Sequence, residues 1–239
     1  MSGYRGIYVP KNSSDSRDGT AMFYLEAKIK VDGQGKPLVL QQGSAQVALV
    51  LICELIEGER KGLPFIVAGT HLKAKRGFEE KREAQGAVLL KYGVERAVRR
   101  IKEYQEKVEG GNGKDYIPPV VVVGDFNDTK DSLVCKKVLE HPLGLRSAYD
   151  KFYLTEEEEE EEKKKYASNT KLSSYYTTYK KREEETCREI DYIFYTPSTL
   201  NCSGVLRVPP LSSLPHRLPA VNYPSDHLSL LATFQFQKQ

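Results

Sequence analysis

Six short apolar runs, each closed by turn residues or polar side chains, constrain the fold of this chain more than any other feature. They are rich in Val, Ile, Phe and Tyr, a composition that favours β-strands. Many of them are apolar at consecutive positions, which is typical of strands covered on both faces. The predicted strands are Ala21–Leu25, Val47–Leu55, Phe65–His71, Val120–Asp125, Ile190–Tyr195 and Leu228–Phe236.

Helices are expected between these strands. Over Glu79–Val108, apolar residues recur near a 3.6-residue period with Lys, Arg and Glu on the other face, which predicts one or two helices. Gly93 interrupts this stretch, and the glycine-rich segment Gly110–Gly113 ends it. A shorter helix is predicted near Asp131–Glu140. Strands that alternate with helices indicate layered α/β packing.

Composition excludes several classes of protein. With 239 residues, 39% hydrophobic and 29% charged, the chain can build a core, so wholesale disorder is excluded. Its longest apolar stretches, Val47–Cys53 and Val120–Val123, fall far short of the roughly 18 residues that a membrane helix needs. The formal net charge of +3 is too small to indicate a nucleic-acid binder from bulk charge alone.

The chain is expected in a reducing compartment. Its 4 cysteines are widely spaced and form no paired motif, which argues against a disulfide framework and against a zinc knuckle. No apolar segment follows the charged residue at the start, so we expect no signal peptide. The predicted location is cytoplasmic; a mitochondrial location would require a presequence ahead of Met1.

One segment differs from the rest in composition. Seven successive carboxylates at Glu156–Glu162 precede Lys163–Lys165. Like charges repel one another and bury nothing, so this segment is predicted to be a solvated loop or frayed helix. We therefore expect a single domain over residues 1–239, with residues 155–170 as an acidic and basic surface insertion.

Polar side chains gather where the apolar runs end. His71 follows one run, Asp125 and Asn127 follow another, and Asp191 interrupts a third. Taken singly, Asp125 could start a turn, Asn127 could cap a helix, and His71 could be a structural histidine. Several such ends together favour a cleft at one edge of the sheet, because strand ends converge there.

Asp191 is the most informative of these residues. A carboxylate within an apolar strand must find a hydrogen-bond donor, and an imidazole is a natural one. His227, beside Asp226, is the best candidate, since an Asp–His pair fixes the imidazole tautomer and raises its basicity. The sequence has no H-E-x-x-H zinc motif, no phosphate-binding P-loop and no G-x-S-x-G elbow, so metalloprotease, NTPase and serine-hydrolase interpretations lose support.

Four ordered motifs resemble the signatures of the endonuclease/exonuclease/phosphatase superfamily. They are Thr70–Lys75 (THLKAK), Gly124–Asn127 (GDFN), Ile190–Ile193 (IDYI) and Ser225–His227 (SDH). Further segments resemble its nocturnin-like branch, which is related to the Ccr-type deadenylases. These are Gly3–Gly6, Asp18–Ala21, Tyr176–Lys180 and Arg217–Pro219.

The resemblance implies a four-layer α/β sandwich, in which helices flank two mostly antiparallel sheets, and Mg²⁺-dependent cleavage of phosphate esters by water. By resemblance, Asp125 would orient or deprotonate the water and Asn127 would hold a phosphate oxygen. His227 would contact the scissile phosphate, oriented by Asp191, and Asp226 would support this cluster or a second metal ion. Asp125, Asn127 and His227 are the expected metal-binding residues.

The resemblance also implies a set of substrate-binding residues. His71 and Lys73 would face the phosphates, and Lys75 matches a basic position near the phosphate of NADP(H). Lys11 and Arg182 would add further positive charge. In an extended segment, the alternation of Lys73 and Lys75 would place both ammonium groups on one side. The expected reaction is removal of the 2′-phosphate of NADP(H) or of adenylates from RNA 3′ ends, and the modest charge favours the small nucleotide.

One feature of the superfamily has no counterpart in this sequence. Its members begin with a strand carrying an Asn and a second strand ending in Gln-Glu, whose Glu holds the Mg²⁺. No such segment precedes Gly3, and Gln105-Glu106 lies within a helical pattern. The domain is therefore expected to be N-terminally truncated and impaired in catalysis. The alternative is a non-catalytic binding or adaptor relative that retains the fold. No membrane association or stable DNA complex is expected, and the sequence identifies no protein partner.

Overall fold

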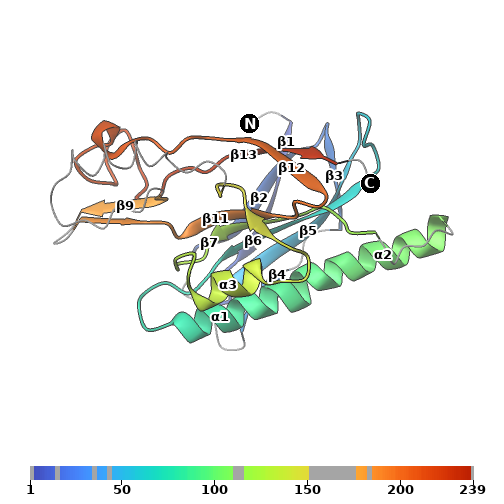
Figure 1. The fold of residues 1–239 in the computed structure, drawn as a ribbon, viewed down its shortest axis with the longest axis horizontal. Coiled ribbons are helices and arrows are strands. Elements are labelled where there is room, and N and C mark those ends of the chain that lie inside the picture. Colours follow the sequence, from blue (N-terminus) through green and yellow to red (C-terminus); the bar gives the residue numbers. More distant parts are fainter. Residues whose placement is uncertain are drawn as a thin grey trace.

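A seven-stranded mixed sheet forms the centre of the molecule in the computed structural model, which describes residues 3–13, 17–33, 37–41, 45–109, 116–150, 176–181 and 185–237. β6 and β7 are parallel, whereas the other neighbouring pairs are antiparallel (Figure 1). The strand order is β3 (Ile29–Asp32), β5 (Val47–Leu55), β6 (Pro64–His71), β7 (Val120–Asp125), β11 (Asp191–Tyr195) and β8 (Arg146–Ser147), with β4 (Pro37–Val39) paired to β5.

Helices cover one face of this sheet (Figure 1). They are α1 (Glu79–Val88), the π-helical segment η1 (Leu89–Val94), α2 (Glu95–Glu109) and α3 (Leu133–Leu139). The predicted helical stretch and the shorter helix are thus confirmed. Gly93 does not break the stretch but lies in η1, where an added Cβ would come within 3.0 Å of Val50 Cγ2 on the sheet. Glycine therefore allows the helix to approach the sheet closely.

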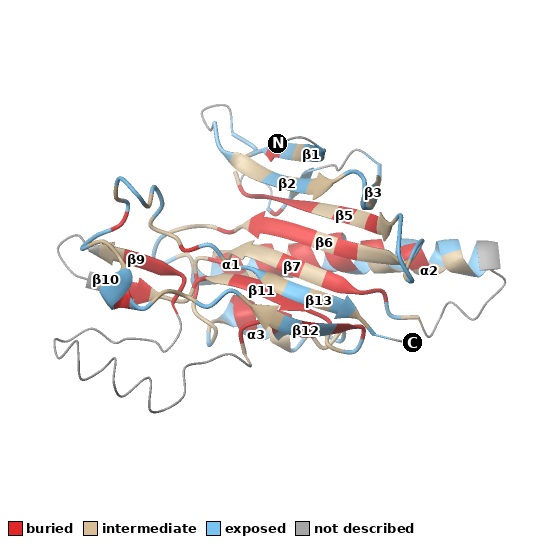
Figure 2. Cartoon of the chain, turned by 90° about the horizontal axis from the view of Figure 1, so that it is seen from above, coloured by how far each residue is buried: buried red, intermediate tan, exposed pale blue. Residues whose placement is uncertain are grey.

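Two antiparallel strand pairs, together called the outer strand layer, cover the opposite face, one over each side of the sheet (Figure 2). They are β1 (Tyr4–Pro10) with β2 (Gly19–Leu25), and β12 (Leu200–Val205) with β13 (Ala232–Phe236). The alternation of strand side chains separates the core on one face of the sheet from the core on the other. In β5, for example, Val47 and Leu49 pack with Val9 of the outer strand layer, whereas Ala48 packs with the helices. The α/β sandwich is confirmed, with three layers among the described residues; the expected outer helix layer has no counterpart in those ranges.

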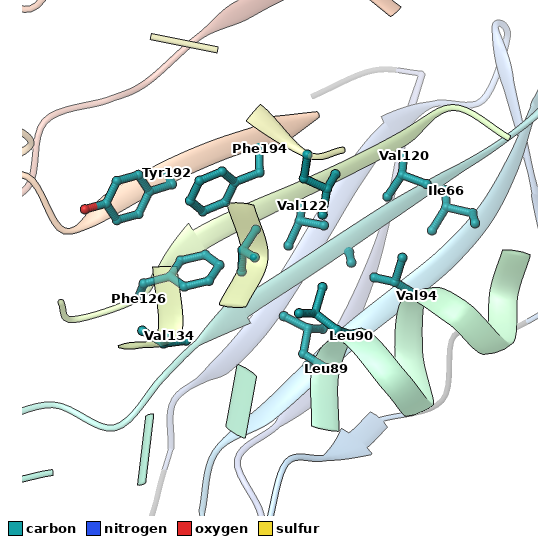
Figure 3. Packing of buried hydrophobic residues seen from close by; sticks show 14 of the residues in the cluster. Ile66, Leu89, Leu90, Val94, Val120, Val122, Phe126, Val134, Tyr192 and Phe194 are labelled. Carbon is teal, nitrogen blue, oxygen red and sulfur yellow. The ribbon is translucent and has the colours of Figure 1, made fainter. Parts of the chain in front are cut away.

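The core between the sheet and the helices contains three aromatic rings, one of which belongs to Phe126, the residue directly after β7. Phe126 is fully buried, and its ring lies edge-on to Tyr192 and Phe194 of β11, with ring centroids 5.7 and 5.3 Å apart (Figure 3). Burying such rings provides a large part of a core's stability. The loop that follows β7 is therefore fixed to the sheet by the Phe126 side chain, which points away from the outer strand layer.

Some strand predictions differ from the structure. Only Ala232–Phe236 of the predicted strand over Leu228–Phe236 is a strand. A β9 (Thr178–Lys181) and β10 (Glu185–Arg188) hairpin was not predicted. Residues 155–170 and Arg182 lie outside the described residues. Among the helices that are described, none has the length and apolar character required to cross a membrane.

Candidate active site

The strand register brings three of the predicted residues into one row. His71 ends β6 and pairs with Asp125 at the end of the parallel strand β7. Asp191 begins β11 and pairs with the same Asp125 across the antiparallel ladder. By alternation, these side chains share the face of Val123 and Ile193, which pack against the outer strand layer. Two polar strand ends and one strand start therefore meet at one edge of the sheet.

The Gly124–Asn127 loop has a backbone that ordinary residues would not adopt. Gly124 has φ +146°, and an added Cβ would lie 2.0 Å from the Thr70 carbonyl oxygen, so only glycine fits. Asn127 has φ +55°, and its N–H donates to Asp125 Oδ1 at 2.7 Å. Phe126 is buried between Asp125 and Asn127 in the sequence. Its packing and this backbone conformation therefore fix both residues at the end of β7, next to His71 and Asp191.

The predicted Asp191–His227 pair is confirmed. A bridge between Thr178 and His227 brings the C-terminal segment to the sheet edge. His227 Nδ1 then lies 3.0 and 3.1 Å from the two carboxylate oxygens of Asp191. Its Nε2 lies 4.0 Å from Asp125 Oδ2. Because Asp191 binds Nδ1, the imidazole presents Nε2 to the shared space beside Asp125.

Thr177 extends this pair into a chain of three residues. Its buried hydroxyl accepts from the backbone N–H groups of Ile190 and Asp191 at 3.1 and 3.0 Å. The hydroxyl hydrogen is then available to donate to Asp191 Oδ2, 2.6 Å away. Thr177 was not predicted, although it lies in the Tyr176–Lys180 motif. Its role depends on two backbone donors that only the folded chain brings to it.

The environment shifts the pKa values of the clustered residues. Burial and the nearby Asp191 charge raise the pKa of Asp125 to about 6. The hydrogen bond to Asp191 raises the pKa of His227 above its usual range. Burial and the nearby Lys11 charge lower the pKa of His71, whose Nε2 lies 3.5 Å from Asp125 Oδ2. Near neutral pH, this leaves a proton acceptor at Asp125 beside an imidazole that retains its proton more readily than usual.

A metal ion could be held at the same place. One ligand atom each from Asp125, Asp191 and His227 lie within 4.8 Å of one another. Asn127 adds an amide at the same loop, but its Nδ2 donates to the Leu72 carbonyl at 3.1 Å, so the amide would present its oxygen to an ion. Of the three predicted metal-binding residues, Asp125 and His227 thus belong to this group, Asn127 does not, and Asp191 takes the third place.

Cationic side chains lie at the margin of the cluster. Lys180 donates to Asp226 Oδ2 at 2.8 Å, so the Asp226 carboxylate pairs with this ammonium group rather than with the three clustered residues. Burial alone would raise the pKa of Asp226, but Lys180 lowers it overall. Lys11 pairs with Asp18, and its charge acts on His71 as described above. Lys11 therefore lies close enough for its charge to act on His71, and its predicted role in substrate binding stays a prediction.

The expected extended geometry of Lys73 and Lys75 is wrong. The strand ends at His71, and Lys75 lies in a bend with φ +82°. Lys73 Nζ lies over the Phe78 ring, 5.0 Å from its centroid. Because the backbone turns between the two lysines, alternation no longer determines the direction of their side chains. Most of the other described residues with a positive φ are glycines, so the lysine at position 75 gave no indication of a turn in the sequence.

Comparison with known proteins agrees with this geometry. A model of the endonuclease/exonuclease/phosphatase family matches residues 41–227. The chain belongs to this family. Human nocturnin is 31% identical over 246 residues, covering 99% of this chain and 50% of nocturnin. The CCR4-Not complex 3′-5′-exoribonuclease subunit Ccr4 of Yarrowia lipolytica is 30% identical over 99% of this chain and 38% of the subunit. The chain thus spans about half or less of the length of these relatives.

Solved structures show the same fold. The human nocturnin catalytic domain with a bound sulfate anion superimposes with a TM-score of 0.66 at 30% identity, covering 98% of this chain and 73% of that domain. ANGEL2, a 2′,3′-cyclic phosphatase solved with adenosine-2′,3′-vanadate, gives a TM-score of 0.69 at 19% identity, covering 97% and 74% of the two chains. The family therefore contains phosphatases and nucleases on one architecture.

Proposed function

We propose that this chain hydrolyses a phosphate ester of a nucleotide at the Asp125, Asp191 and His227 cluster. The single observation that carries this proposal is the arrangement of a carboxylate with a pKa of about 6 beside an imidazole oriented by a second carboxylate. Membership of a family of phosphatases and nucleases supports it.

In this proposal, Asp125 accepts a proton and His227 stabilises the charge that develops on the phosphate. Asp125 is largely ionised near neutral pH and accepts the proton of an attacking water molecule. The water oxygen bonds to phosphorus as the ester P–O bond breaks. The leaving oxygen takes up a proton from solvent, and Asp125 releases the proton that it accepted back to solvent. His227 Nε2–H donates to a phosphate oxygen, where negative charge develops. Thr177 and Asp191 hold the imidazole in the tautomer that makes this possible.

Mg²⁺ is the proposed cofactor, and the residues present fit a divalent cation. Asp125 supplies a carboxylate and Asn127 an amide oxygen, the hard oxygen ligands that Mg²⁺ prefers. When bound, the ion would neutralise phosphate charge and lower the pKa of water. Both Asp191 oxygens face hydrogen-bond donors, from Thr177 and His227. The described residues thus leave Asp125 as the main carboxylate anchor, so we propose that this chain binds the ion weakly and acts slowly.

We propose that the preferred substrate is NADP(H), cleaved at its 2′-phosphate, with adenylate RNA as the second candidate. We take Lys75 to supply positive charge to the substrate, and the Lys11 charge already acts on His71. A terminal phosphate carries two negative charges whereas a phosphodiester carries one, so positive charge at the site favours the terminal phosphate. The nocturnin and Ccr4 relatives support a nucleotide or nucleic-acid substrate, and Ccr4 is described as an exoribonuclease. The net charge of +3 favours the smaller substrate.

Substrate choice is tested with Lys75→Ala. We expect this variant to weaken NADPH binding more than binding of an oligoadenylate RNA, with Lys102→Ala on α2 as the control. Equal losses for both ligands would contradict the assignment. Because a non-catalytic binding relative is the alternative function, binding and product release are both measured. Ligand binding without release of phosphate from NADPH or of adenylate from RNA, at any Mg²⁺ concentration, would favour that alternative.

A further inference from the structure

Helix α1 turns a polar edge toward the sheet. Arg82 and Gln85 are 2% and 0% exposed, at positions where the helical repeat would normally place apolar residues. A buried guanidinium is costly unless several acceptors surround it. The contacts of Arg82 therefore show which parts of the chain it holds.

Arg82 connects two segments that carry site residues. Its Nε donates to Asp128 Oδ2 at 2.7 Å, directly after the Gly124–Asn127 loop. Its Nη1 donates to the carbonyl oxygens of Lys73 and Lys75 at 3.1 and 2.8 Å. The Arg82 side chain thus fixes the backbone of residues 73–75 relative to the loop that carries Asp125.

Two amide side chains reinforce this connection. Gln85 Oε1 accepts from the Lys73 N–H at 2.9 Å. Asn127 Nδ2 donates to the Leu72 carbonyl at 3.1 Å. Residues 73–77 belong to no strand or helix. Their backbone, including φ +82° at Lys75, is held by the contacts of Arg82 and Gln85 and by the Glu79 carboxylate, which accepts from the Gly77 N–H at 3.1 Å and from Arg82 Nη2 at 3.1 Å.

We infer that Arg82 is a positioning residue that fixes the backbone of Lys73 and Lys75 relative to the loop carrying Asp125, so that their ammonium groups can bind a phosphate group at the site. This inference rests on the proposed function, because it takes the lysines to face a phosphate. Arg82 itself is too deeply buried to contact substrate. It acts through backbone carbonyls, so its loss changes where two ammonium groups lie without removing either charge.

The test replaces the branched guanidinium with a single ammonium group in Arg82→Lys. Lysine keeps the charge but cannot reach Asp128 and two carbonyls at once. We expect the affinity for inorganic phosphate and the KM for NADPH to worsen about tenfold or more, with kcat changing less than about threefold. We also expect the Lys73 amide to exchange with solvent at least about tenfold faster, because its segment opens more often.

Controls separate positioning from general destabilisation. Arg100→Lys on α2 alters an exposed ion pair with Asp32 of β3 and should change neither phosphate affinity nor Lys73 exchange. If Arg82→Lys does not fold, Asp128→Asn tests the same connection, since it keeps the shape and removes the charge. When Arg82→Lys is added to Lys75→Ala, the further loss of phosphate affinity should be much smaller than in the wild-type background.

The outcomes distinguish this inference from the proposed function. Unchanged phosphate affinity and unchanged Lys73 exchange in both Arg82→Lys and Asp128→Asn would overturn the inference, as would fully additive losses with Lys75→Ala. Absence of phosphate binding by the wild-type chain would overturn it as well. If phosphate affinity and exchange respond as expected but no substrate is turned over, the inference stands and the hydrolase proposal fails.

Discussion

Asp125→Asn should stabilise the fold near neutral pH while removing the proton acceptor of the site. Burial and the charge of Asp191 raise the pKa of Asp125 from its ordinary value of 3.8 to about 6, because both disfavour its ionised form. Asparagine has no charge to bury, and its oxygen can still accept from the Asn127 N–H that now bonds to Asp125 Oδ1.

The size of the effect follows from the two pKa values. Between pH 3.8 and pH 6, the folded state holds a proton on Asp125 that the unfolded state has already released, so the free energy of unfolding falls as pH rises. A difference between 3.8 and 6 corresponds to about 3 kcal/mol. The cost is absent below about pH 3, where Asp125 is protonated in both states, is small at pH 4, and approaches its full value above about pH 6.

Urea unfolding of wild type and Asp125→Asn at pH 4 and pH 7, without divalent ions, measures this cost. The variant should gain up to about 3 kcal/mol in unfolding free energy at pH 7 and little at pH 4. Added Mg²⁺ should narrow the difference at pH 7, since a cation stabilises the ionised carboxylate. A variant less stable than wild type at pH 7, or equally stabilised at both pH values, would refute this explanation of the Asp125 environment.

Three further predictions concern neighbouring residues. Thr177→Val should misorient Asp191 and lower turnover by about tenfold or more, whereas Thr177→Ser, which keeps the hydroxyl, should restore most of it in the same assay. Gly124→Ala should cost at least about 3 kcal/mol in thermal or urea unfolding, because its Cβ would collide with a carbonyl oxygen; an unchanged midpoint would count against the close approach. Lys180→Ala should raise the pKa of Asp226 in an NMR titration, since the ammonium group now lowers it; a fall would show that the ion pair does not form in solution.

Local sequence pattern was sufficient for the central strands. The bounds of β5 and β7 match the predicted ranges Val47–Leu55 and Val120–Asp125, because both strands are buried on two faces and read as continuous apolar runs. The β1–β2 hairpin gave a weaker pattern: most of β1 is exposed, and Val9 is its one fully buried residue. Its place in the fold is set by packing against β5 rather than by its own composition.

The site was predictable where chemistry alone requires a partner. A carboxylate at Asp191 needs a donor, and the pairing with His227 followed from that requirement. Arg82 gave no such signal, since a charged residue in a helix ordinarily faces solvent and its acceptors lie on two distant segments. Lys75 was placed wrongly because the turn at its backbone is imposed by those same tertiary contacts.

The most direct measurement is phosphate release from NADPH by the purified chain and by His227→Ala, side by side across a Mg²⁺ titration, with adenylate release from oligoadenylate RNA measured in parallel. We expect slow release by the wild-type chain that increases into the millimolar Mg²⁺ range, and at least about a 100-fold loss in His227→Ala, the lower end for a group that acts on a proton or developing charge. Equal release by the two proteins, or release independent of Mg²⁺, would contradict the assignment of hydrolysis to the Asp125, Asp191 and His227 cluster.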